Sequence, residues 1–144
     1  MTTAQNILQV KGAGVWSVEP DTPVISALKV MHEKNIGALV VVRDNAVLGI
    51  ISERDYARKL ALKGRSVDSA TVQDLMTTGV ITVTPDQSLD LCMDLMTAKR
   101  IRHLPVVDNG KLVGVISIGD VVKAVISEKE DLIRHLENYI TGAR

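Results

Sequence analysis

An internal repeat constrains this chain more than any other feature of its sequence. Shifting the sequence by 65 positions aligns Gly14–Asp55 with Gly79–Asp120 without a gap, and 15 of the 42 aligned pairs are identical. A match of this length without gaps indicates two copies of one structural unit. We therefore expect a first unit with a helical lead-in at 1–64, a polar linker at 65–71, and a second unit with a helical C-terminal extension at 72–144.

Each copy predicts the same order of elements, β-α-β-β-α. A short extended piece, 15–18 or 80–83, runs into a Pro-Asp turn and then an amphipathic helix. Two apolar runs follow in each copy, and the turn residues Asp44-Asn45 or Asn109-Gly110 join them as hairpins. Short lead-in helices are expected at 4–10 and 72–76, and a closing helix with an apolar stripe at 128–140.

The strand pattern predicts how the copies bury their apolar surface. The runs at 38–42 and 104–107 are continuously apolar rather than alternating, so each strand is expected to be covered on both faces. One small sheet with two helices cannot close a core alone. We therefore predict a mixed α/β (α+β) fold in which the two units pack sheet to sheet about a pseudo-twofold axis, with related clefts at their junction.

Composition narrows the classes of partner. The 17 basic and 17 acidic residues cancel, and the chain has no Phe, one Trp and two Tyr. Such a chain has neither the net positive field nor the aromatic platforms typical of nucleic-acid binding. The N-terminus lacks a signal-peptide pattern, and no apolar run reaches the roughly 18 residues of a membrane span. Cys92 is the single cysteine, expected to be buried as a small hydrophobic residue. We expect a cytoplasmic protein with no nucleic-acid or membrane partner.

The two strand-to-helix junctions carry the candidate site. Each has the pattern Gly-x-x-Ser-x-x-Asp, with Ser52 and Asp55 in the first copy and Ser117 and Asp120 in the second. One interpretation is helix capping, because the serine stands at the N-cap and the aspartate at N3. The other is ligand binding, in which the carboxylate accepts hydrogen bonds from a ribose diol and the free N–H groups face phosphate. The pattern alone leaves both open, and one residue can serve both roles.

The same stretches resemble a known family. The sequences GIISERD at 49–55, GVISIGD at 114–120 and IRHLPVVD at 101–108 are similar to those of the CBS domain, named after cystathionine β-synthase. The resemblance covers roughly residues 14–126 and occurs twice. It implies a stand-alone CBS pair, a regulatory module that binds an adenosyl ligand such as AMP, ADP, ATP or NAD, often as a homodimer. The expected ligand-binding residues are Ser17, Val18, Gly37, Ala38, Ile51, Ser52, Arg54, Asp55, Thr82, Val83, Arg102, His103, Pro105, Ile116, Ser117 and Asp120.

The two copies differ where the resemblance implies contact with phosphate. Arg54 precedes Asp55, whereas Gly119 precedes Asp120; Arg102-His103 in the second copy replaces Gly37-Ala38 in the first. An arginine can hold a phosphate with two hydrogen bonds, although a solvated surface arginine is the simpler interpretation. His103 is either a pH-sensitive group or a packed, hydrogen-bonded histidine. We expect two chemically unequal sites, with aliphatic side chains rather than aromatic rings around the adenine.

No catalytic pattern emerges from the sequence. It lacks a nucleophile elbow, a P-loop lysine motif, a G-x-G-x-x-G turn and a His/Cys/Asp cluster at metal-ligand spacing. The leading hypothesis is a non-catalytic module that senses an adenine nucleotide and transmits its state to an unidentified partner protein. The alternative is a dimerisation or interaction module whose clefts stay empty. An enzyme acting on a nucleotide is the third and weakest possibility.

Overall fold

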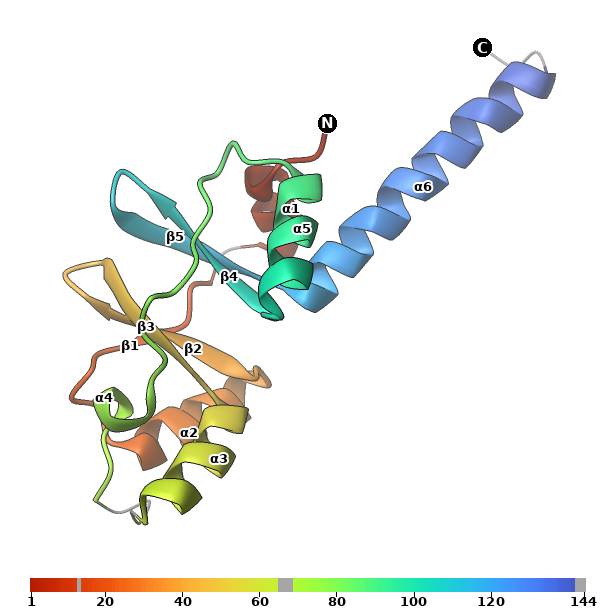
Figure 1. Cartoon of the computed structure of the whole chain (residues 1–144). Helices are drawn as coiled ribbons and strands as arrows, with labels where there is room; N and C mark the ends of the chain where they lie inside the picture. Colours follow the sequence, from red (N-terminus) through yellow and green to blue (C-terminus); the bar gives the residue numbers. More distant parts are fainter. Residues whose placement is uncertain (13, 65–68, 142–144) are drawn as a thin grey trace. The chain divides into compact units, whose positions relative to one another are not determined.

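The computed structural model describes residues 1–12, 14–64 and 69–141, so part of the expected linker, 65–68, lies outside the described residues. The elements follow the predicted order in the first repeat and, apart from its first strand, in the second, and the mixed α/β class is confirmed (Figure 1). They are α1 Ala4–Lys11, β1 Ser17–Val18, α2 Val24–Lys34, β2 Ala38–Arg43, β3 Ala46–Ser52, α3 Glu53–Lys63, α4 Val72–Leu75, α5 Leu89–Lys99, β4 His103–Asp108, β5 Lys111–Ser117 and α6 Ile118–Thr141.

The hairpins form at the predicted turns. Asp44 and Asn45 have φ values of 53° and 66°, and Asn109 and Gly110 have 51° and 79°. Positive φ at both central residues matches the right-handed twist of a two-residue hairpin, and Asn, Asp and Gly tolerate it best. In the first copy, β2 pairs antiparallel with β3 from Ala38 opposite Ser52 to Arg43 opposite Ala46, with a bulge between Val41 and Val42.

The short first strand forms in only one copy. In the first repeat β1 runs parallel to β2, and the N–H of Val40 donates to the carbonyl oxygen of Trp16 at 3.3 Å. The second repeat has a two-stranded sheet, β4-β5, and Val83 is a single bridge residue among the described positions 80–83. Pro105 replaces Val40 there, and proline has no N–H to donate to a neighbouring strand. This substitution accounts for the missing third strand.

Contacts divide the chain into two compact units. The terminal unit comprises Met1–Ala13, Val83–Leu104 and Ile116–Arg144; the central unit comprises Gly14–Thr82 and Pro105–Val115. In the central unit α2 packs on β2, and α3 packs on β3 and α4 (Figure 1). Their shared core contains Val24, Ala27, Met31, Leu39, Val41, Ile51, Ala70, Val72 and Leu75. Three consecutive buried residues in β2 agree with a strand covered on both faces.

Each lead-in helix is docked on the other repeat. The N–H of Ala4 in α1 donates to the carbonyl oxygen of Gln87 at 2.8 Å. The N–H of Val72 in α4 donates to the carbonyl oxygen of Thr22, also at 2.8 Å. Thr22 and Gln87 are equivalent positions of the two repeats. Segment 1–12 therefore completes the second repeat within the terminal unit, and segment 69–76 completes the first within the central unit. The compact units thus differ from the repeat boundaries expected at 1–64 and 72–144.

The closing helix is longer than expected. The second-repeat helix and the stretch 128–140 form one helix of 24 residues, α6, which contacts α1 and α5. From Ile126 to Thr141 every residue of α6 is exposed. Within this part Arg134 pairs with Asp131, three residues before it on the helix. No described helix combines the length and apolar character needed to cross a membrane.

Candidate functional site

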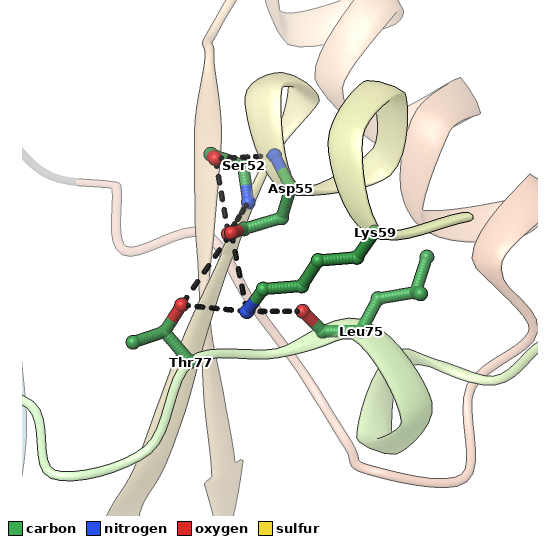
Figure 2. A network of polar contacts seen from close by, with 5 residues as sticks. All are labelled: Ser52, Asp55, Lys59, Leu75 and Thr77. Atoms are coloured by element: carbon green, nitrogen blue, oxygen red, sulfur yellow. Dashed lines mark hydrogen bonds and ion pairs between the residues drawn. The ribbon is translucent and has the colours of Figure 1, made fainter. Parts of the chain in front are cut away.

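Both predicted Ser-Asp pairs form reciprocal hydrogen bonds at a helix start. In the central unit the N–H of Ser52 donates to Asp55 Oδ2 at 3.0 Å, and the N–H of Asp55 donates to Ser52 Oγ at 3.1 Å (Figure 2). In the terminal unit the corresponding distances for Ser117 and Asp120 are 2.8 and 3.2 Å. These are capping boxes, so the capping interpretation is correct for both copies. They also hold each carboxylate at the exposed start of its helix.

Asp55 lies in a polar network that joins α3 to the segment after α4. Lys59, one turn further along α3, places its ammonium 3.4 Å from Asp55 Oδ1 (Figure 2). The same ammonium donates to Thr77 Oγ1 at 3.0 Å and to the carbonyl oxygen of Leu75 at 3.1 Å. Thr77 Oγ1 also donates to Asp55 Oδ1 at 3.4 Å. Lys59 is therefore held by three acceptors from two segments of the central unit.

Asp120 also has a lysine partner, but from a different part of the fold. Lys11, the last residue of α1, places its ammonium 2.9 Å from Asp120 Oδ2. The position equivalent to Lys59 in the second repeat is Ala124, which carries no charge. The side chain of Asp120 is 17% exposed and that of Lys11 is 38% exposed, so the pair is partly accessible to solvent.

The charges around Asp120 act on one another. Burial alone raises the pKa of Asp120, but the N–H of Ser117 and the ammonium of Lys11 outweigh it and hold that pKa below its usual value. The pKa of His103 is lowered, first by burial and then by the positive charges of Lys11 and Arg102, against the opposing effect of Asp120. The imidazole is therefore neutral at pH 7, which agrees with the packed rather than the pH-sensitive interpretation.

Several of the other predicted residues gather near the two helix starts. The N–H of Glu53 donates to the carbonyl oxygen of Gly37 at 3.1 Å, and Ala38 lies opposite Ser52. In the terminal unit the N–H of Ile118 donates to the carbonyl oxygen of Arg102 at 2.8 Å. Each helix start is thus joined to the residue that begins or precedes the first hairpin strand of its repeat.

The remaining predicted residues occupy other environments. Ser17 and Val18 pair with Val40 and Val41 in the sheet, and the side chain of Arg54 is exposed. Thr82 is exposed and belongs to the central unit. The apolar residues of the predicted set are buried in the core of this structure: Ile51, Val83, Pro105 and Ile116. An adenine contact by these side chains stays a prediction, as does a cleft between the repeats.

Sequence reasoning missed Lys11, Lys59 and Thr77. Lys59 stands four residues after Asp55 on a predicted helix, and that i,i+4 spacing is a signal for an ion pair. Lys11 is 109 positions from Asp120, and no local pattern joins them. Among the described residues no three His, Cys, Asp or Glu side chains come together as ligands for a metal ion.

The fold and these junctions define a duplicated α/β protein with a capped acidic helix start in each repeat. The sequence pattern of the CBS domain matches residues 12–62 and again 72–127. The chain is 43% identical to the CBS domain-containing protein CBSX3, mitochondrial, of Arabidopsis thaliana, over 98% of this chain and 73% of that protein. The chain belongs to the CBS-domain family.

Solved structures of CBS-domain proteins share this fold. The CBS domain of NE2398 is 43% identical with a TM-score of 0.84, over 88% of this chain and 99% of that one. CBSX2 in complex with AMP is 27% identical with a TM-score of 0.74, covering 88% and 98%. The CBS pair of MJ0100, in complex with 5′-methylthioadenosine and S-adenosyl-L-methionine, is 26% identical with a TM-score of 0.77, covering 88% and 98%. Adenosyl compounds thus bind to two CBS pairs similar to this one.

Proposed function

We propose that this protein is a non-catalytic regulatory module that binds an adenine nucleotide (AMP, ADP, ATP or NAD) and transmits the ligand state to a partner protein. The observation that carries the proposal is the pair of capped aspartates, Asp55 and Asp120, each held at a helix start with a lysine ammonium beside it. The adenosyl ligands of CBSX2 and MJ0100 support the same ligand class.

The chemistry of a ribose fits these carboxylates. A carboxylate offers about four lone-pair positions, and the capping bonds use only part of them. The two hydroxyls of a ribose diol are donors that a fixed carboxylate can accept together, as in dinucleotide-binding folds. Helix N–H groups close to the carboxylate favour a nearby phosphate. Asp55 and Asp120 thus combine a structural role in capping with a proposed role in ligand binding.

The two sites are proposed to be unequal. Arg54 stands beside the first carboxylate, whereas Arg102 and His103 accompany the second. Guanidinium groups at different places offer phosphate different geometries, so affinity or ligand preference should differ between sites. Transmission then requires that the ligand bind two arrangements of the protein with different affinity.

Isothermal titration calorimetry tests this proposal on the full chain with AMP, ADP, ATP and NAD. Asp55→Asn and Asp120→Asn keep one side-chain oxygen for the cap but remove the charge, and each is expected to weaken nucleotide binding about tenfold or more. Glu137→Gln, at an exposed carboxylate near the end of α6 and away from the pocket beside Asp120, serves as the control and should bind like the parent. If the parent binds none of these nucleotides, the ligand class is wrong. Two identical sites in the parent would contradict the inequality.

Self-association through α6 is a second candidate function, favoured by its exposed apolar stripe. Leu132, Leu136 and Tyr139 are 58%, 52% and 87% exposed. With Val122 and Val125 they follow the 3.5-residue spacing with which like helices pair as coiled coils, and Lys129 is the one charged residue in the series. The exposed half carries both signs of charge, with Glu128, Lys129, Glu130 and Asp131 at its start and Arg134, His135 and Glu137 further on. An apolar stripe at this spacing is complementary to itself, so we propose that a second copy of α6 covers it.

Sedimentation velocity distinguishes a dimer from a monomer. The parent is expected to be dimeric at micromolar concentration and the Leu132→Glu/Leu136→Glu double variant monomeric, because two buried charges oppose the pairing. Ser127→Glu lies on the opposite face of the heptad and should remain dimeric. A monomeric parent, or a double variant that stays dimeric, would exclude α6 as the interface.

A further inference from the structure

The two repeats obtain the lysine beside their aspartate in different ways. Lys59 belongs to the same helix as Asp55, whereas Lys11 belongs to α1 and reaches Asp120 across 109 positions of sequence. Because the second repeat has Ala124 at the position equivalent to Lys59, duplication alone does not explain the second ammonium. The same charge arrangement has been assembled twice from non-equivalent residues, which points to a role for the ammonium itself.

The two ammonium groups have different surroundings. Lys59 is shared among Asp55, Thr77 and the carbonyl oxygen of Leu75, so it joins segments of the central unit (Figure 2). Lys11 and Asp120 line a pocket of about 410 Å³ between α1 and α6, which lies within the terminal unit. Ligand pockets in proteins commonly measure roughly 300–1,000 Å³. Lys11 is therefore next to a space that can accept a small molecule.

The groups around Asp120 carry an excess of positive charge. Lys11 and Arg102 each contribute a positive charge and Asp120 a negative one, and Lys123 adds a further positive charge to the lining of the pocket. The acidic lining residues Glu128 and Asp131 lie about two to three helical turns further along α6. When ribose hydroxyls donate hydrogen bonds to the carboxylate of Asp120, that carboxylate neutralises less of the positive charge on the ammonium of Lys11. A phosphate on the ligand restores that compensation, whereas the positive sulfonium of S-adenosylmethionine adds like charge.

We propose that Lys11 is a specificity-determining residue of the Asp120 site, which makes this site select phosphate-bearing adenine nucleotides over S-adenosylmethionine and uncharged adenosine. This inference rests on the proposed function and refines it, because it names the ligand chemistry of one of the two sites. It also makes α1, which lies outside the second repeat in sequence, a part of that repeat's binding site.

The test measures affinity for AMP, adenosine and S-adenosylmethionine by calorimetry in the full-length chain carrying Asp55→Asn, so that the signal comes from the Asp120 site. Lys11→Gln removes the ammonium, Lys11→Arg restores a positive charge, and Lys99→Gln removes a charge elsewhere on the terminal unit. Lys11→Gln is expected to weaken AMP binding about tenfold, the usual loss for one charge-assisted hydrogen bond. Adenosine binding should change less than about twofold. Lys11→Arg and Lys99→Gln should keep the preference of the Asp55→Asn chain for AMP.

The ratio of AMP to adenosine affinity separates the possible outcomes. If Lys11→Gln weakens both ligands equally, Lys11 only supports the structure and the inference is wrong. The inference also fails if Lys11→Gln leaves the affinity for both AMP and adenosine unchanged, or if the Asp55→Asn chain binds S-adenosylmethionine more tightly than AMP. If the unsubstituted parent binds none of the adenine compounds, the proposed function itself fails and this inference fails with it.

Discussion

A Cβ atom on Gly49 would lie 2.7 Å from the carbonyl oxygen of Thr77. The approach is close because the backbones of Ile50 and Thr77 exchange two hydrogen bonds, of 3.0 and 2.9 Å, which attach the segment after α4 to β3. Met76 Sδ would also lie 2.9 Å from that Cβ. Glycine is therefore required at position 49 by packing, since only a residue without Cβ fits.

Gly49→Ala is expected to lower the free energy of unfolding by about 1–3 kcal/mol, because a backbone carbonyl must move to admit the methyl group. Gly119→Ala is the matched control: the nearest atom to its Cβ is Ser117 Oγ at 3.7 Å, and the residue lies in α6. Alanine there should stabilise by about 0.5–1 kcal/mol through helix propensity. Urea denaturation measures both, and equal effects of the two substitutions would contradict this account.

Docking of α1 predicts a pair of variants with opposite outcomes. Ile7 is 5% exposed and Val10 is 90% exposed on the same helix. Ile7→Ala should cost about 2–4 kcal/mol of unfolding free energy, and Val10→Ala should cost less than about 0.5 kcal/mol. Hydrogen exchange should show that Ile7→Ala loosens residues 85–96 of the second repeat. Faster exchange in the first repeat alone would be inconsistent with the docking described above.

Asp120 predicts a dependence of stability on pH. Its folded-state pKa is lowered, so its contribution is fully present above the ordinary aspartate pKa, about 3.9, and is lost as the pH falls through the lower folded value. Asp120→Asn should therefore be less stable than the parent at pH 7, and the difference should shrink progressively below about pH 4. Asp131→Asn, at an exposed pair, should differ little at either pH. A difference that grows on acidification would refute this assignment.

Cys92 is expected to be unreactive in the folded protein. Its side chain lies in the terminal unit with no exposed surface, and burial raises the pKa of its thiol. Because the thiolate is the reactive form, a disulfide reagent such as Ellman's reagent should label no thiol at neutral pH until the protein unfolds. The guanidinium-denatured protein, which should release one equivalent, is the control. Immediate labelling of the native protein would show that the residue is accessible.

The elements themselves could be predicted because their causes are local. The turn residues Asn109 and Gly110, the apolar runs of the strands and the serines at the helix starts each act within a few positions of sequence. The capping interpretation of Ser117 and Asp120 follows from a three-residue spacing, and the structure has that bond. Local propensity and apolar pattern agreed for every helix and for both hairpins, which is why these elements were predicted in the correct order.

Long-range relationships were not accessible in the same way. Lys11 and Asp120 are joined by the fold alone, and nothing near either residue indicates the other. The duplication creates two similar docking surfaces, one in each repeat. The sequence does not indicate that α1 packs on the surface of the second repeat rather than on that of the first. The strand expected at 80–83 does not form because Pro105, in the neighbouring strand, has no N–H to donate. The proline is visible in the sequence, but its effect can be predicted only when the neighbouring strands are known.

The exchange of lead-in helices has a consequence for dissecting this protein. A cut at the boundary between repeats would separate α1 from the surface it completes and leave α4 attached to the wrong fragment. Neither half, expressed alone, would carry its own first helix, although each would contain a full copy of the family's sequence pattern. A fragment meant to represent the first repeat should therefore span 14–82, which keeps Thr77 beside Ile50. A fragment meant to represent the second should join 1–12 to 83–141 through a new junction.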